Sequence, residues 1–132
     1  MKIKIISKNK IKGGFAGEAI EEYTKRLARY CRTELKFTHN PEKAIKDRDY
    51  VIKVGKGGAV LSSEQLAERI SSLGIGGNSD IAIVLHDDCK GLRIDFSLEI
   101  SRMDIHEDLM LIMLYEQIYR AYRIINNEPY HK

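Results

Sequence analysis

Residues 81–85 are five apolar residues in succession, and they constrain the fold more than any other segment of the chain. An uninterrupted apolar run of this length is typical of a strand that is buried on both faces of a sheet. Strands of this kind belong to parallel sheets, because the helices that connect parallel strands cover the faces of the sheet. The run therefore predicts an α/β fold.

Helical and strand patterns alternate on either side of this run. Apolar residues at helical spacing predict three helices, over residues 15–31, from Ser62 to about residue 73, and over residues 108–126. Ser62 and Gln65 have the spacing of a capping box, which marks the start of the second helix. Short apolar runs predict further strands at residues 3–6, 35–38, 50–54 and 96–100. The alternation predicts one domain, residues 1–132, with a parallel sheet of about five strands flanked by helices.

A parallel sheet also predicts the place of a ligand site. Ligands of open α/β sheets bind beyond the carboxyl ends of the strands. In this chain three such ends are predicted, at Val54–Gly55, at Leu85–His86 and at Ile100–Ser101. We therefore expect the loops that follow these three strands to form the site.

The charge is unevenly distributed along the sequence. Residues 1–56 contain 15 Lys and Arg against 7 Asp and Glu, whereas residues 57–132 contain 7 against 12. A basic half can attract a polyanion such as RNA, or it can form an ordinary solvated surface, and charge alone favours neither. No apolar run approaches the length of a membrane span, and the N-terminus has no signal-peptide core. With two cysteines outside any CxxC spacing, these features predict a cytoplasmic protein.

The C-terminal residues carry the most specific motif. Residues 115–121 read YEQIYRA and residues 128–132 read EPYHK, which resembles the end of the RlmH family of SPOUT methyltransferases. Further matches to this family are MKIKII at the start, EEYTKRLARYC in the first helix, LSSEQLAERI after the third strand and SDIAIVL in the fourth. The resemblance covers nearly the whole chain, although the middle is shorter than is usual in the family.

The resemblance implies a SPOUT α/β domain with a C-terminal trefoil knot, active as a homodimer. It further implies S-adenosylmethionine-dependent methylation of N3 of a pseudouridine in large-subunit ribosomal RNA. The implied partner is ribosomal RNA or the ribosome, and neither DNA nor a membrane. Carried over by position, the cofactor pocket falls on the same three strand ends, at Val54, Gly55, His86, Ile100, Ser101, Arg102, Met103, Asp104 and Ile105.

The terminal motif supplies three candidate catalytic residues. His131 titrates near neutrality and could contact the target base. Arg120 could stabilise negative charge or hold a phosphate, and Tyr130 could stack on a base or hydrogen-bond to it. Arg120 is also four residues from Glu116, so the two side chains could simply form an ion pair along the helix.

The sequence departs from the family pattern after the fourth strand. The family has a glycine pair there, in a pattern like I-G-G-x-x-G, whereas residues 85–91 of this chain read LHDDCKG. His86 and Asp87 thus put side chains where glycine would let the backbone approach a ligand closely. A family Pro-His pair is matched by His106–Glu107, and a following arginine position by Leu111.

Two functions therefore stay open, namely methyl transfer in a modified pocket and RNA or ribosome binding by a catalytically impaired homologue. A metal site at residues 86–89 is less favoured, because contiguous ligands do not by themselves form a closed site. We expect no metal.

Other prominent side chains have ordinary interpretations. Tyr119 and Tyr122 are expected to be core or dimer contacts, and three methionines are expected to pack in the core, Met103, Met110 and Met113. The lysines of the first loop could bind RNA phosphates or be solvated, namely Lys8, Lys10 and Lys12.

Overall fold

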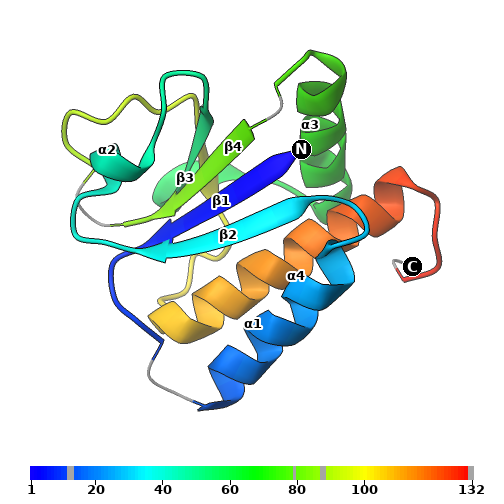
Figure 1. Ribbon diagram of the computed structural model, residues 1–132, viewed down its shortest axis with the longest axis horizontal. Coiled ribbons are helices and arrows are strands. Elements are labelled where there is room, and N and C mark those ends of the chain that lie inside the picture. The colour runs from blue at the N-terminus through cyan, green and yellow to red at the C-terminus, as the bar shows by residue number, and fades with distance from the viewer. Residues whose placement is uncertain (12–13, 79, 87–88, 131–132) are drawn as a thin grey trace.

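The computed structural model describes residues 1–11, 14–78, 80–86 and 89–130. In these ranges it contains one parallel sheet with the strand order β2-β1-β4-β3-β5, together with four helices (Figure 1). In chain order the elements are β1 (Lys2–Ser7), α1 (Gly14–Leu27), β2 (Arg32–Phe37), α2 (Pro41–Ala44), β3 (Tyr50–Val60), α3 (Ser63–Ile75), β4 (Asp80–Leu85), β5 (Phe96–Glu99) and α4 (Glu107–Ile125). The predicted α/β fold is confirmed, with the apolar run of β4 inside the sheet between β1 and β3.

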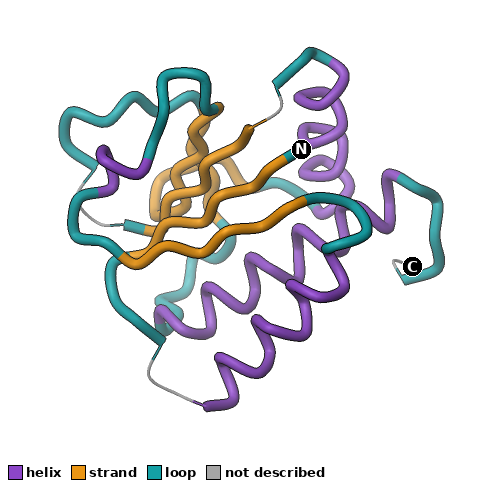
Figure 2. The backbone as a smooth tube through the Cα atoms, viewed as in Figure 1, coloured by secondary structure: helices purple, strands orange, loops and turns teal. Residues whose placement is uncertain are grey.

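Three helices cover one face of the sheet. Figure 2 shows α1 and α4 lying side by side along this face, with α3 near the far end of α4. The core between the helices and the sheet is continuous, and Tyr115 and Ile118 of α4 are 1% and 0% exposed at its centre. Because Tyr119 and Tyr122 are also buried, the expectation that they pack in the core is confirmed.

The opposite face has a thinner cover, formed by α2 and the segment after β4. A small apolar cluster of the sheet, Ile6, Val51, Ala82 and Val84, packs against Ala44, Ile45, Cys89, Leu92 and Ile94. A lysine is buried beside this cluster. The Nζ atom of Lys4 donates to the carbonyl of Ala44 at 2.6 Å and lies 3.4 Å from the Oδ2 atom of Asp49. The backbone N–H of Lys46 donates to the same carboxylate oxygen at 2.8 Å, so Asp49 joins the loop to the sheet.

The third strand is longer than the sequence predicts. We expected it to end at Gly55, but β3 continues to Val60 after a shift of register against β5. Leu98 of β5 pairs with Val54 before the shift and with Ala59 after it, so residues 55–58 form a bulge. Gly57 has a φ of +83°, and a Cβ atom on Gly58 would lie 2.7 Å from the backbone carbon of Leu98. The bulge therefore requires glycine at both positions.

Other element boundaries are set by hydrogen bonds along the backbone. The first helix ends at Leu27 rather than at residue 31, and the second strand begins at Arg32, ahead of its predicted start. The capping box of α3 is confirmed, because Ser62 Oγ accepts from the N–H of Gln65 at 3.1 Å and Gln65 Oε1 accepts from the N–H of Ser62 at 2.9 Å.

The trefoil knot stays a prediction. Within the described ranges, every helix is too short or too polar to cross a lipid bilayer.

Candidate active site

Two adjoining cavities lie at the carboxyl ends of the strands, where the sheet predicts a site. The larger, of about 250 Å³, is lined by Val54, Gly55, Lys56, Ile100, Ser101, Met103, Asp104, Ile105 and Met110. The smaller, of about 130 Å³, is lined by Ser7, Lys8, Val54, Gly55, Leu85, His86, Ile105, Glu107 and Met110. Because they share Val54, Gly55, Ile105 and Met110, we describe them as two lobes of one pocket, the large lobe and the small lobe.

The residues predicted to bind the cofactor are thus brought together from three separate segments, namely β3 with its bulge, the end of β4 and the loop between β5 and α4. All of them line one lobe or both, except Arg102, whose side chain is exposed outside the lobes. Met103 was expected in the core, and this expectation is wrong: its side chain is 74% exposed at the rim of the large lobe. The reason is that the loop between β5 and α4 leaves the sheet at its carboxyl edge, beyond the helices that cover the core. Met110 packs against the core, whereas Met113 is 36% exposed.

Lys56 joins the glycine bulge to this loop, and sequence reasoning missed it. Its ammonium donates to the backbone carbonyl of Arg102 and lies 3.3 Å from the Oδ1 atom of Asp104. On the same loop, Ser101 Oγ accepts from the N–H of Met103 at 3.0 Å. The available signal in the sequence was a single charged residue inside the run GKGG, next to a predicted strand end.

His86 forms part of the wall of the small lobe. Its side chain is only 7% exposed, and its backbone carbonyl accepts from the Sγ atom of Cys89 at 3.3 Å. Since about 130 Å³ stays open beside it, the histidine does not close the pocket. Asp87 and Asp88, the two carboxylates of the metal site considered at residues 86–89, lie outside the described residues. Within the described ranges, no three His, Cys, Asp or Glu side chains gather as a metal-ligand group.

Two further positions at which the sequence departs from the family have structural roles at the start of α4. The Nδ1 atom of His106 accepts from the backbone N–H of Asp108 at 3.2 Å and thereby caps the helix. Leu111 is 2% exposed in the core. In the first loop, Lys8 lines the small lobe and Lys10 is exposed, while Lys12 lies outside the described residues.

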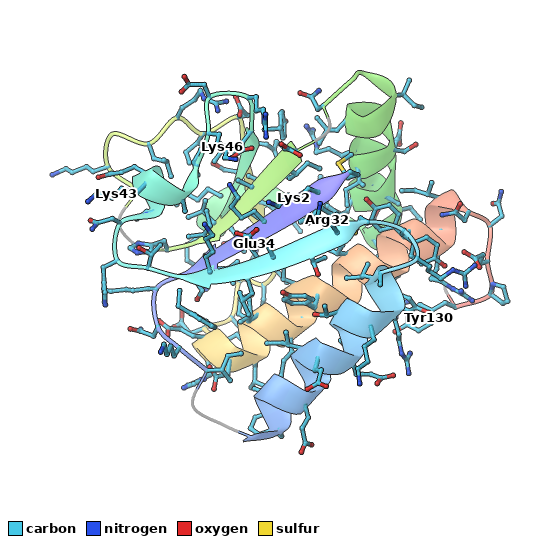
Figure 3. All side chains as sticks on the ribbon, viewed as in Figure 1. Lys2, Arg32, Glu34, Lys43, Lys46 and Tyr130 are labelled. Carbon is cyan, nitrogen blue, oxygen red and sulfur yellow. The ribbon has the colours of Figure 1, made fainter. Side chains whose placement is uncertain are left out.

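The candidate catalytic residues lie at the other end of α4. The predicted ion pair is confirmed, with the Nη2 atom of Arg120 lying 2.9 Å from the Oε1 atom of Glu116. The same guanidinium lies 4.8 Å from the ring centroid of Tyr130, whose ring also packs edge-on against Tyr119 at 5.0 Å. Figure 3 shows Tyr130 beside the C-terminal ends of α1 and α4. His131 lies outside the described residues.

Glu128 anchors the segment that carries Tyr130. Its carboxylate accepts from the hydroxyl of Tyr30 at 2.5 Å and from the guanidinium of Arg123 at 3.1 Å, and it lies 3.2 Å from Arg29. Arg123 also donates to the carbonyl of Pro129 at 2.9 Å. These contacts hold the tail against α1 and α4.

One protomer does not bring the tail to the pocket. Met110 lines both lobes, and Arg120 follows ten residues later on the same helix. At the rise of an α-helix this separation is about 15 Å. The pocket and the predicted catalytic residues are therefore two separate groups within a single chain.

Burial raises the pKa of two tyrosines of α4 and the C-terminal segment. It raises the pKa of Tyr130 to about 12, so this hydroxyl stays protonated and can donate a hydrogen bond throughout the neutral range. Burial likewise raises the pKa of Tyr115 to about 12.

These shifts predict how stability depends on alkaline pH. The pKa of an unfolded tyrosine is about 10, so the folded protein holds these protons more tightly than the unfolded chain does. The tyrosines' contribution to the free energy of unfolding is therefore complete below pH 10 and falls as the pH rises from about 10 to about 12. Tyrosinate absorbance and urea denaturation over this interval measure both effects. Ionisation of all tyrosines together near pH 10, with stability unchanged, would contradict the prediction.

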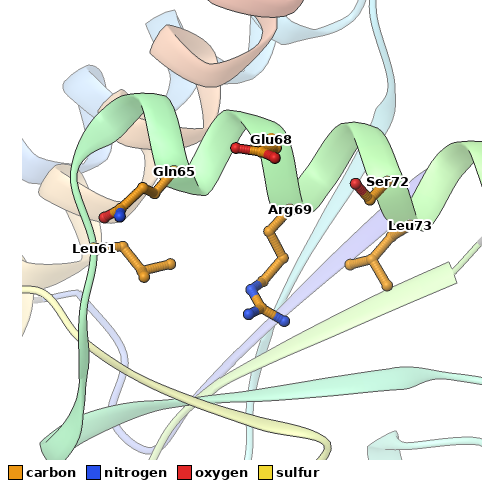
Figure 4. Close-up of a pocket in the computed structure, with 6 residues that line it drawn as sticks. All are labelled: Leu61, Gln65, Glu68, Arg69, Ser72 and Leu73. Carbon is orange, nitrogen blue, oxygen red and sulfur yellow. The ribbon is translucent and has the colours of Figure 1, made fainter.

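A further cavity, of about 430 Å³, lies along α3 (Figure 4). Arg69 extends from the helix into it, 3.7 Å from the ring centroid of Phe96, and its Nη1 atom lies 3.4 Å from the hydroxyl oxygen of Tyr50. None of the predicted site residues lines this cavity. It is therefore separate from the pocket at the strand ends.

The chain has extensive similarity to known proteins. A family model described as predicted SPOUT methyltransferase matches residues 1–131. A protein named ribosomal RNA large subunit methyltransferase H from Clostridium botulinum (strain Alaska E43) is 38% identical over 160 aligned positions, covering 100% of both chains. One named ribosomal RNA large subunit methyltransferase H 1 from Thermoanaerobacter sp. (strain X514) is 42% identical over 121 positions, covering 89% of this chain and 90% of its own.

These relatives differ in length. The alignment with the clostridial protein has 160 positions against 132 residues here, so this chain lacks about 28 of its positions. The Thermoanaerobacter protein, covered to 90% by 121 positions, is about as long as this chain. The five strands and the helices that cover the main face are all present in this shorter form. The chain thus belongs to the SPOUT methyltransferase family, and it is a methyltransferase.

Proposed function

We propose that this methyltransferase transfers the methyl group of S-adenosylmethionine to N3 of a pseudouridine in large-subunit ribosomal RNA, as a cytoplasmic homodimer. The observation that carries the proposal is the convergence of three segments on one pocket, namely β3 with its bulge, the end of β4 and the loop before α4, at the positions where the resemblance predicts the cofactor site. The names of the relatives support ribosomal RNA as the substrate. The terminal motif, residues 128–132, supports the pseudouridine.

The residues of the pocket fit the chemistry of this cofactor. Small-molecule pockets have volumes of roughly 300–1,000 Å³, and the combined volume of the two lobes lies within this range. Val54, Ile100 and Ile105 supply apolar walls, and a Cβ atom added at Gly55 would have only the Lys53 side chain as a neighbour, at 3.7 Å. When bound, the cofactor supplies a methyl group on a positively charged sulfonium. The carboxylates of Asp104 and Glu107 favour such a charge at the two lobes.

The other residues serve the nucleic-acid substrate. The N3 proton of the base must leave during methyl transfer, and a positive charge stabilises the anion that results. Arg120 supplies a charge of this kind, and the protonated hydroxyl of Tyr130 supplies a hydrogen-bond donor. Three exposed basic side chains, Arg32 on β2, Lys43 on α2 and Lys46 just after it, supply positive charge for the RNA backbone (Figure 3).

A homodimer would bring the two groups together. Since the tail is about 15 Å along α4 from the pocket of its own chain, we propose that it serves the pocket of the partner. Exposed apolar side chains on α1 and α4 are available for such an interface: Phe15 is 62% exposed and Leu109 is 47% exposed. A monomeric protein at micromolar concentration, measured by sedimentation, would contradict this arrangement.

Calorimetric titration with S-adenosylmethionine and S-adenosylhomocysteine tests the proposed function. We expect saturable binding of both, together with methyl incorporation into ribosomes or large-subunit RNA that lack the modification. Because His86 stands where the family has glycine, a second candidate is an RNA-binding homologue without turnover. Salt-sensitive RNA binding with no affinity for either nucleoside would favour that candidate and exclude the enzyme.

A further inference from the structure

The rim of the large lobe carries one positive and one negative charge. Lys56 lies in the glycine bulge and Asp104 lies on the loop before α4, and their charged atoms are 3.3 Å apart. Both residues line the lobe, whose other lining side chains are Val54, Ile100, Ser101, Met103, Ile105 and Met110. Lys56 and Asp104 are thus the two charged side chains among the described residues that line the lobe, and they lie at one place on its wall.

Lys56 and Asp104 can give up their contact with each other and contact a bound ligand instead. The side chains of Lys56 and Asp104 are 55% and 100% exposed, and exposed ion pairs contribute little to stability. By contrast, a ligand that places its own charges against them gains charge-assisted hydrogen bonds inside a partly enclosed cavity. The α-amino-acid group has the complementary pattern, because its carboxylate and its ammonium are attached to the same carbon atom.

We propose that Lys56 and Asp104 form a subsite for the amino-acid end of the cofactor, in which Lys56 binds the carboxylate and Asp104 binds the ammonium. The inference rests on the proposed function, since it requires that the pocket binds S-adenosylmethionine. Two other basic residues near the pocket are less suitable. Arg102 lines neither lobe with its side chain, and Lys8 lines only the small lobe.

The test compares ligands with and without the amino-acid group. S-adenosylhomocysteine carries this group, whereas 5′-methylthioadenosine has the same nucleoside and sulfur without it. We expect Lys56→Met to weaken binding of S-adenosylhomocysteine by about tenfold or more, the usual effect of losing a hydrogen bond to a charged group. Binding of 5′-methylthioadenosine should be unchanged, and Asp104→Asn should show the same selectivity. Lys56→Arg should retain part of the affinity.

A matched control comes from a second exposed pair. Lys25 and Glu21 of α1 are also 3.3 Å apart, with side chains 70% and 69% exposed, and neither lines the pocket. Lys25→Met should therefore leave the affinity for both ligands unchanged. Thermal unfolding should show the same midpoint for both lysine variants, because both pairs are exposed.

Each of the other possible results would contradict the subsite, the proposed function or both. If the wild-type protein binds S-adenosylhomocysteine and Lys56→Met binds it equally well, the subsite is wrong and the proposed function stands. If Lys56→Met loses affinity for both ligands alike, Lys56 shapes the pocket and does not recognise the amino acid. If the wild-type protein binds neither ligand, the proposed function and the subsite fail together.

Discussion

Replacing Gly58 with alanine is expected to destabilise the protein and to abolish cofactor binding. The added Cβ atom would lie 2.7 Å from the carbonyl carbon of Leu98 and 2.8 Å from its nitrogen, and both are backbone atoms of β5. They cannot move aside without breaking the pairing of β3 with β5. Forcing atoms into a packed site costs about 1–3 kcal/mol, and the displaced bulge carries Gly55 and Lys56 of the pocket.

Urea denaturation and calorimetric titration measure the two effects of this substitution. Gly17→Ala is the matched control, because in the described part of the chain a Cβ atom at Gly17 would meet no heavy atom within 4 Å beyond the backbone of its own helix. In a helix this change should stabilise by about 0.5–1 kcal/mol and leave the pocket intact. If Gly58→Ala retained both wild-type stability and wild-type affinity, the close approach of the bulge to β5 would not determine the shape of the pocket.

Removing Asp49 should destabilise the protein still more. Lys4 and Asp49 are 6% and 3% exposed, so Asp49→Ala leaves the ammonium of Lys4 buried, with the carbonyl of Ala44 as its remaining partner among the described residues. Breaking one side of a buried ion pair costs about 3–5 kcal/mol, because the remaining charge is no longer compensated. The N–H of Lys46 also loses its acceptor.

Denaturation of single and double variants separates these contributions. Lys4→Met combined with Asp49→Ala should recover part of the loss, since no buried charge then remains. Glu21→Ala, which breaks the exposed pair with Lys25, should change the free energy of unfolding by less than about 0.5 kcal/mol. A loss for Asp49→Ala no larger than that for Glu21→Ala would show that the charge of Lys4 reaches water.

The pocket and the candidate catalytic residues lie at opposite ends of α4. The helix begins beside the two lobes and carries Arg120 at its other end, where Tyr130 packs against it. The length of the helix separates these groups in one chain, which is why we propose that methyl transfer involves a second copy. Although this chain is shorter than the clostridial relative, α4 and the strands that line the pocket are all present in it.

Features that depend on near neighbours along the chain could be predicted from the sequence alone. The apolar run of β4, the helical periodicity of α1 and α4, and the capping box at Ser62 are local patterns, and the structure contains each of them. The strand ends predicted from these patterns also identified the edge of the sheet where the pocket lies.

Features that depend on residues far apart in the sequence become visible only in the folded protein. The extension of β3 past Gly55 requires pairing with β5, about 40 residues later, and its sequence pattern resembles a turn. Lysine is normally a surface residue, yet Lys4 is buried because Ala44 and Asp49 supply partners for its ammonium. Lys56 faces Asp104 only after the bulge and the loop meet at the sheet edge. In each case the deciding contact lies about 40 residues or more away, where local periodicity carries no information.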